Sequence, residues 1–146
     1  MMRAFALLAL LLALNCRGQQ HVLIVKADTT LPTKWEGPFT LEAKATSVRI
    51  GDLRNDMIAQ GYLAASCDSV TADKDSTRCY FHLGQRYRWA RLSAGTLPEE
   101  IASAAGFRER TYRGRPVTPR QVAKLFEGLL EECENNGFPF AVVRLD

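Results

Sequence analysis

The stretch Gly61-Tyr62-Leu63-Ala64-Ala65-Ser66-Cys67 is matched by Gly137-Phe138-Pro139-Phe140-Ala141-Val142-Val143, at an offset of 137 minus 61, or 76 positions. In each copy a helix-like pattern ends at the glycine, an aromatic residue follows at once, and a strand-like run begins shortly afterwards. Glycine suits this place because a chain that leaves a helix sharply takes a positive φ, which residues with a Cβ rarely adopt. The repeat predicts two copies of one small unit, with Gly61, Tyr62, Gly137 and Phe138 as structural residues.

The residues around the first copy predict strands on both sides of one helix. Residues 21–28 form an apolar, β-branched run that is typical of a strand, and residues 29–40 contain the prolines and glycine of a loop. Residues 47–60 place apolar side chains at helical spacing before the terminal glycine. Residues 62–70 and 78–83 flank a polar turn and predict the two arms of a hairpin.

The residues before the second copy repeat this order with one helix added. Residues 86–92 are strand-like, and a capping box at residues 96–99 predicts a short helix that ends at Gly106. A second capping box, at residues 118–121, opens the most strongly amphipathic helix of the chain, which Gly137 ends. Residues 138–145 then predict a further strand.

Length and composition limit the class of protein. With 146 residues, 47% hydrophobic and 24% charged, the chain has room for one ordinary domain or two small ones, and its composition is that of a globular protein. The formal charge of +3 is too weak a bias to favour nucleic acid as a partner.

The start of the sequence is typical of a signal peptide. Arg3 precedes an apolar run over residues 4–14, and small and polar residues follow it up to Gln19. The run is about half the roughly twenty residues that a spanning helix needs, so we expect residues 1–18 to be removed on export. A lipid-modified Cys16 is the alternative. Export makes nucleic acid an unexpected partner.

Two cysteines flank the predicted hairpin turn. Cys67 and Cys79 are equidistant from Asp73, so they are expected to face each other across the two strands. In an oxidising compartment such a pair forms a disulfide, whereas the alternative is two small buried thiols. Cys133 stays unpaired in either case. The sequence holds no CxxC motif and no Cys/His cluster, so we expect no metal site and no cofactor.

The order of elements resembles a known family. The predicted order is a strand, a short helix, a long helix that ends in glycine and an aromatic residue, and two further strands. This order, repeated at a spacing of 76 positions, resembles tandem POTRA domains. These are the periplasmic modules of the outer-membrane protein assembly and translocation factors. Residues 134–141 resemble the family's junction between helix and strand, and residues 81–87 resemble its passage from one module to the next. The resemblance covers residues 21–146.

The resemblance implies an α+β fold of two small modules, each a mixed three-stranded sheet packed by helices. The first module, residues 19–84, is atypical because residues 29–46 contain proline and glycine where its first helix is expected. The second module, residues 85–146, lacks its last strand. Family members of this type continue into a membrane barrel, so we expect the chain to be an N-terminal fragment without the barrel. A short secreted relative is the alternative.

The resemblance implies non-covalent binding of outer-membrane proteins or assembly partners on the periplasmic side of the outer membrane. A physical means is β-augmentation, in which a partner adds a strand to an exposed sheet edge. The edges expected to take part are those of the arm at residues 78–83 and the strand at residues 138–145. Association with the membrane would run through the barrel that is missing from this chain. A free-standing periplasmic adaptor or lipoprotein that bridges envelope proteins is the alternative function.

Catalytic residues are not evident in the sequence. His21 and His82 are its two histidines, and neither has an evident nucleophile as a partner. Neither a G-x-S-x-G motif nor a glycine-rich phosphate loop occurs, so we expect no enzymatic activity.

A basic cluster is the remaining candidate for partner binding. It contains four arginines with Phe107 and Tyr112 interleaved: Arg108, Arg110, Arg113 and Arg115. The cluster predicts either a solvated loop between helices or a docking surface for an acidic partner or membrane surface.

Overall fold

The computed structural model describes residues 20–145, which form two compact units. The first unit consists of residues 20–53 and 66–82, and the second of residues 54–65 and 83–145. The predicted signal peptide and Cys16 lie outside the described residues. The predicted α+β class is confirmed.

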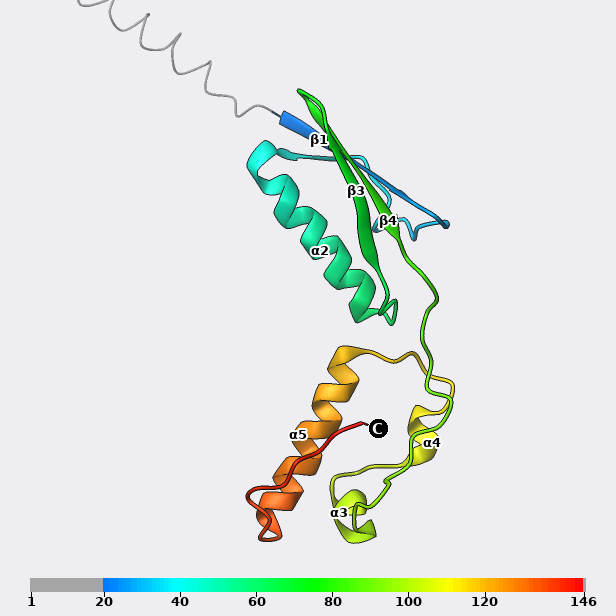
Figure 1. Ribbon diagram of the computed structural model, residues 1–146, viewed down its shortest axis with the longest axis vertical. Helices are drawn as coiled ribbons and strands as arrows, with labels where there is room; N and C mark the ends of the chain where they lie inside the picture. Colours follow the sequence, from blue (N-terminus) through cyan, green and yellow to red (C-terminus); the bar gives the residue numbers. More distant parts are fainter. Residues whose placement is uncertain (1–19, 146) are drawn as a thin grey trace, which may run out of the picture. The chain divides into compact units, whose positions relative to one another are not determined.

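The first unit contains one four-stranded mixed sheet (Figure 1). The strands are ordered β2-β1-β4-β3. β1 (Gln20–Ala27) is parallel to β4 (Ser76–His82), whereas β2 (Phe39–Glu42) is antiparallel to β1 and β3 (Ser66–Ala72) is antiparallel to β4. The parallel pair requires a long crossover, which the intervening helix supplies.

Alternating side chains of the two central strands form the core of the sheet. In β1 and β4 every second residue is buried, and the buried set is His21, Leu23, Val25, Thr77, Cys79 and Phe81. The two polar side chains of this set form a hydrogen bond with each other, with 2.8 Å between His21 Nε2 and Thr77 Oγ1. His21 is therefore a structural histidine in this core.

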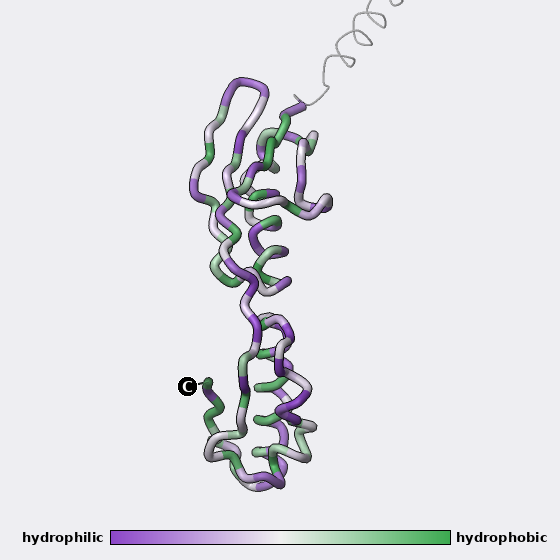
Figure 2. The backbone as a smooth tube through the Cα atoms, turned by 90° about the vertical axis from the view of Figure 1, so that its right-hand side faces the viewer, coloured by the Kyte–Doolittle hydropathy of each residue, from purple (hydrophilic) through white to green (hydrophobic). Residues whose placement is uncertain are grey.

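One helix lies along this sheet (Figure 1). A short 3-10 turn, η1 (Ala43–Ala45), leads into α2 (Thr46–Ala59), on which Leu53 is fully buried. The helix predicted over residues 47–60 is confirmed within one residue at each end. Figure 2 shows that the turn between β3 and β4 is hydrophilic, in agreement with the polar stretch that predicted the hairpin.

The two glycines of the repeat end their helices in the same way. Gly61 and Gly137 have φ of 96° and 86°. The glycine N–H donates to the carbonyl three residues before it, at 2.9 Å from Gly61 and 3.1 Å from Gly137. The next N–H donates to the carbonyl five residues before it, at 3.2 Å from Tyr62 and 2.8 Å from Phe138. This pair of bonds is the Schellman motif, which satisfies carbonyls that a helix end leaves open.

Besides the end of α2, the described residues of the second unit form α3 (Glu99–Ala104), α4 (Glu109–Tyr112) and α5 (Pro119–Asn135). α5 buries Leu125, Leu129 and Cys133 and contacts α3. The N-cap predicted at Thr118 is confirmed, because its side chain accepts a hydrogen bond from the Gln121 N–H at 3.3 Å. The returning bond of a capping box is not formed, because Gln121 Oε1 is buried without a hydrogen-bond partner among the described residues. The capping box predicted at residues 96–99 is wrong, because Pro98 occupies the N-cap of α3 and has no side-chain oxygen that could accept a hydrogen bond.

Four predictions about strands and loops need correction. Phe39 was predicted in a loop but opens β2, so the sheet has four strands where three were expected. The hairpin arm predicted from residue 62 begins at Ser66. Residues 86–92 and 138–145 form no strand among the described residues, apart from an isolated bridge between Arg88 and Pro116. Their local pattern is strand-like, but a strand also needs a partner with which to pair.

Candidate functional site

The open edges of the first unit's sheet are β2 and β3. The expectation that the arm at residues 78–83 offers an edge is wrong, because β4 pairs with β1 on one side and β3 on the other. β2 has only four residues, whereas β3 has seven. β3 is therefore the longer edge to which another strand could add.

The exposed residues of β3 are of the kinds that allow another strand to pair with a sheet edge. Residues 68–72 are all exposed, and the Val70 side chain is 54% exposed. Residues 69–72 are small or β-branched and uncharged, so no lysine or proline blocks their backbone groups. The regular edge ends at Asp68, because a β-bulge lies between Cys67 and Ser69. The Asp68 carboxylate is also engaged locally, since Ser66 Oγ donates a hydrogen bond to Asp68 Oδ1 at 2.7 Å. The usable edge is residues 69–72.

The two hairpin cysteines come together beside this edge. Cys67 lies opposite Phe81 and Cys79 lies opposite Val70, so the cysteines are diagonal neighbours rather than directly opposed. Their Sγ atoms are nevertheless 2.7 Å apart. Burial raises the pKa of the Cys79 thiol far above its ordinary value, and the hydrogen bond and charge of Cys67 raise it further. Both sulfurs are thiols in the structure, and the disulfide stays a prediction.

The two repeat glycines differ in what surrounds them. A Cβ on Gly61 would meet the Cβ of Pro116 and the carbonyl of Val117, each at 3.2 Å. A Cβ on Gly137 would meet nothing within 4 Å. The Gly61 carbonyl also accepts a hydrogen bond from the Tyr87 N–H at 2.9 Å. Gly61 therefore belongs to a tight internal junction, whereas Gly137 opens onto solvent.

The four arginines of the basic cluster are all exposed, in and beside α4. The interleaved aromatic residues pack together beneath them. The rings of Phe107 and Tyr112 are stacked at 5.8 Å between centroids, and Trp89 meets Tyr112 edge-on at 6.0 Å. The aromatic side chains therefore hold the segment in place, and the side chains that the cluster exposes to solvent are positively charged. Partner binding by Arg108, Arg110, Arg113 and Arg115 stays a prediction.

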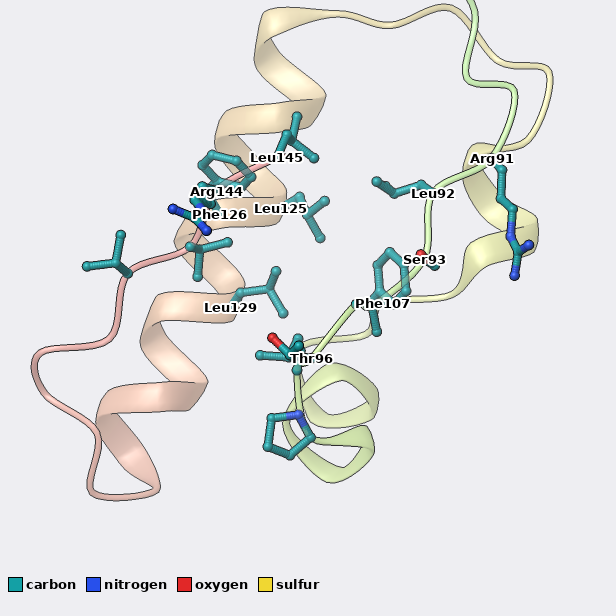
Figure 3. Close-up of a pocket in the computed structure, with 16 residues that line it drawn as sticks. Arg91, Leu92, Ser93, Thr96, Phe107, Leu125, Phe126, Leu129, Arg144 and Leu145 are labelled. Atoms are coloured by element: carbon teal, nitrogen blue, oxygen red, sulfur yellow. The ribbon is translucent and has the colours of Figure 1, made fainter.

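A groove in the second unit was not predicted from the sequence. Its volume is about 600 Å³, and Figure 3 shows its side chains on two opposing sides. Residues 91–98 and Phe107 form one side, residues 142–145 form the other, and α5 contributes Leu125, Phe126 and Leu129. No single stretch encodes this groove, because it joins segments that lie about fifty residues apart.

The two histidines lie in polar pairs rather than beside a nucleophile. His21 contacts Thr77, and His82 Nδ1 contacts the Asp28 carboxylate. Within residues 20–145 no group of three or more histidine, cysteine and acidic side chains gathers as a metal site requires.

Comparison with known proteins gives no family. No protein-family model matches the sequence, and no curated protein matches it. Among the described helices, none is both long and apolar enough to cross a membrane.

Proposed function

We propose that this chain is a pair of periplasmic POTRA-type modules of an outer-membrane β-barrel assembly or translocation factor. It binds client or partner polypeptides non-covalently, by adding one of their strands to β3. The observation that carries this proposal is the open β3 edge over residues 69–72. The mixed sheet packed against helices is compatible with a small module of this kind.

Binding through an edge suits partners of varied sequence. The bonds formed are between main chains, which every client carries, and they place few demands on side chains. The uncharged surface of residues 69–72 leaves these backbone groups accessible to clients of either charge. A single added strand also binds weakly enough to be released, as transport of a client requires.

An edge substitution tests the proposal. Val70→Lys places a charge on the edge, which disfavours strand addition, whereas Val70→Thr keeps a β-branched residue there. Val70 is exposed, so both variants are expected to fold. We expect a fluorescent extended peptide to bind the full chain and the threonine variant with similar affinity, and the lysine variant more weakly. Equal binding by all three would contradict the assignment of β3 as the binding edge.

A further inference from the structure

Arginines from two distant segments meet at one turn of the second unit. The Trp89 N–H donates to the Arg115 carbonyl at 2.9 Å, and the Gly114 N–H donates to the Trp89 carbonyl at 2.8 Å. Across this pairing, Arg88 Nη1 donates to the Gly114 carbonyl at 2.7 Å. Arg88 therefore lies beside the turn that carries Arg113 and Arg115.

A fourth arginine lies next to the same turn. The Cβ position of Gly61 is 3.2 Å from the Pro116 Cβ and 3.5 Å from the Arg86 Cγ, so Arg86 lies beside the residue that follows Arg115. All four side chains are exposed. They form a surface, called the arginine surface below, that consists of Arg86, Arg88, Arg113 and Arg115.

Neutral groups hold two of these arginines in place. Arg86 Nε donates to the Gln60 carbonyl at 2.7 Å, as Arg88 does to the Gly114 carbonyl. A carbonyl oxygen orients a guanidinium without neutralising its charge, as a carboxylate would. Because these side chains are positioned before a ligand arrives, binding costs them less conformational entropy.

The positive charge of this region is largely uncompensated. Residues 86–120 contain eight arginines, no lysine and three acidic residues, which gives a net charge of 8 minus 3, or +5. The other residues of the range 20–145 contain nine basic and twelve acidic residues, or a net charge of −3. Among the ion pairs of the described residues, Arg91 with Glu109, at 3.1 Å, involves an arginine of this region. The chain therefore concentrates its positive charge on one part of the second unit.

The surface has the properties of a membrane contact more than those of a protein interface. No large hydrophobic side chain is exposed within residues 88–120, whereas the centre of a protein interface is apolar. The half-exposed Tyr87 borders this range, and tyrosine rings are common where a membrane meets water. An anionic membrane needs only positive charge for binding, and guanidinium groups donate paired hydrogen bonds to phosphate.

We infer that the arginine surface docks on an anionic membrane, where its guanidinium groups bind the phosphates of lipid headgroups. This function goes beyond the proposed one, because it uses side-chain charge in the second unit and no strand edge. The contact is peripheral, so it would keep the second unit at a membrane surface without inserting any segment into the hydrocarbon core.

Sedimentation of the full chain with vesicles measures this contact. One set of vesicles contains phosphatidylcholine alone, and the other contains equal parts of phosphatidylcholine and phosphatidylglycerol. We expect binding to the second set only, and we expect it to fall as salt is added, because salt screens exposed charges beyond about 10 Å at 0.1 M. Failure to bind the anionic vesicles at low salt would overturn the proposal.

Two variants of equal charge locate the contact. One removes three positive charges from the arginine surface, and its control removes three from elsewhere in the chain. The six positions are exposed, so both variants are expected to fold. The substitutions are Arg88→Gln, Arg113→Gln and Arg115→Gln in the first variant, and Lys26→Gln, Lys74→Gln and Lys124→Gln in the control.

The two variants should differ strongly in vesicle binding. A basic residue close to an anionic membrane contributes about fivefold, so the arginine variant should bind about a hundredfold more weakly than the unchanged chain. The control should stay within about fivefold, because its charges lie away from the contact. Equal losses would assign binding to net charge and overturn the docking surface. The single variants Arg113→Gln and Lys124→Gln repeat this comparison with the least change to the fold.

A soluble polyanion separates a membrane from an acidic protein. Binding to polyglutamate but not to the anionic vesicles would assign the arginine surface to an acidic polypeptide and overturn a membrane contact. Peptide binding at β3 does not use these arginines. Failure of the vesicle experiments would therefore leave the proposed function intact, and loss of peptide binding at β3 would leave the membrane contact intact.

Discussion

Cys79 of β4 lies diagonally across the hairpin from Cys67 of β3, with 2.7 Å between their Sγ atoms. We expect this pair to form a disulfide when a low-molecular-weight disulfide accepts the two electrons and two protons that the thiols release. After removal of residues 1–18, thiol counting under denaturing, non-reducing conditions should then find only Cys133. A count of three thiols in the exported protein would contradict the pairing.

The disulfide should stabilise the hairpin that carries the proposed binding edge. The bridge would close a loop of 79 minus 67, or 12 residues, and loops of this size contribute roughly 2 to 3 kcal/mol. A reducing agent is therefore expected to lower the melting temperature of the oxidised protein. The Cys67→Ser variant serves as the control, because its melting temperature should not respond to the same reagent.

The reduced protein should lose stability at alkaline pH. Burial holds the pKa of Cys79 above its unfolded value, so the folded state keeps a proton that the unfolded state releases. The contribution of this thiol is complete below the ordinary thiol pKa of about 8.5 and declines as the pH rises above it. Urea denaturation of the reduced protein at pH 7.5 and pH 10 should show the decline. The Cys79→Ala variant should show a smaller one, and an equal decline would contradict the assignment.

The elements that the sequence predicts well are those with local causes. α2 and α5 follow from apolar side chains at helical spacing, and their ends follow from Gly61 and Gly137 with the same pair of hydrogen bonds. All of these interactions lie within a few residues of the chain. The seven-position repeat therefore has a shared local geometry even though the surroundings of the two glycines differ.

The elements that the sequence predicts poorly depend on distant partners. β2 is four residues long and exists through its pairing with β1, so Phe39 looks like part of a loop when read alone. Residues 138–145 have the composition of a strand, but the described residues offer them no paired neighbour. The groove between residues 91–98 and 142–145 was missed for the same reason. Only the three-dimensional arrangement shows which distant segments lie side by side.

The contact between His21 and Thr77 should matter for stability. Both side chains are buried, and their hydrogen bond of 2.8 Å links the central strands β1 and β4. Thr77→Val keeps the shape but leaves the His21 ring nitrogen without its partner, which should cost about 1 to 3 kcal/mol in chemical denaturation. Thr77→Ser retains the hydroxyl and should cost less. Equal losses in the two variants would assign the effect to packing alone.

The basic cluster should act through charge and contribute little to the fold. Because Arg108, Arg110, Arg113 and Arg115 are exposed, replacing all four with glutamine is expected to leave the melting temperature nearly unchanged. The same variant should lose salt-dependent binding to vesicles that contain anionic lipid, whereas a four-lysine variant should retain it. Equal vesicle binding by the original chain and the glutamine variant would assign these residues to a solvated loop.

Three glycine-to-alanine variants should differ in stability in a fixed order, with Gly51→Ala the most stable, Gly137→Ala next and Gly61→Ala the least stable. Gly51 lies inside α2 with nothing near an added Cβ, so Gly51→Ala should stabilise the chain by about 0.5 to 1 kcal/mol. Gly137→Ala meets no neighbour but must hold a positive φ, which should cost about 1 kcal/mol. Gly61→Ala adds crowding against Pro116 and Val117 and should cost more. Urea denaturation of the full chain measures the stability of all three variants. If Gly61→Ala is no less stable than Gly137→Ala, the residues around Gly61 can shift to accept a Cβ without loss of stability.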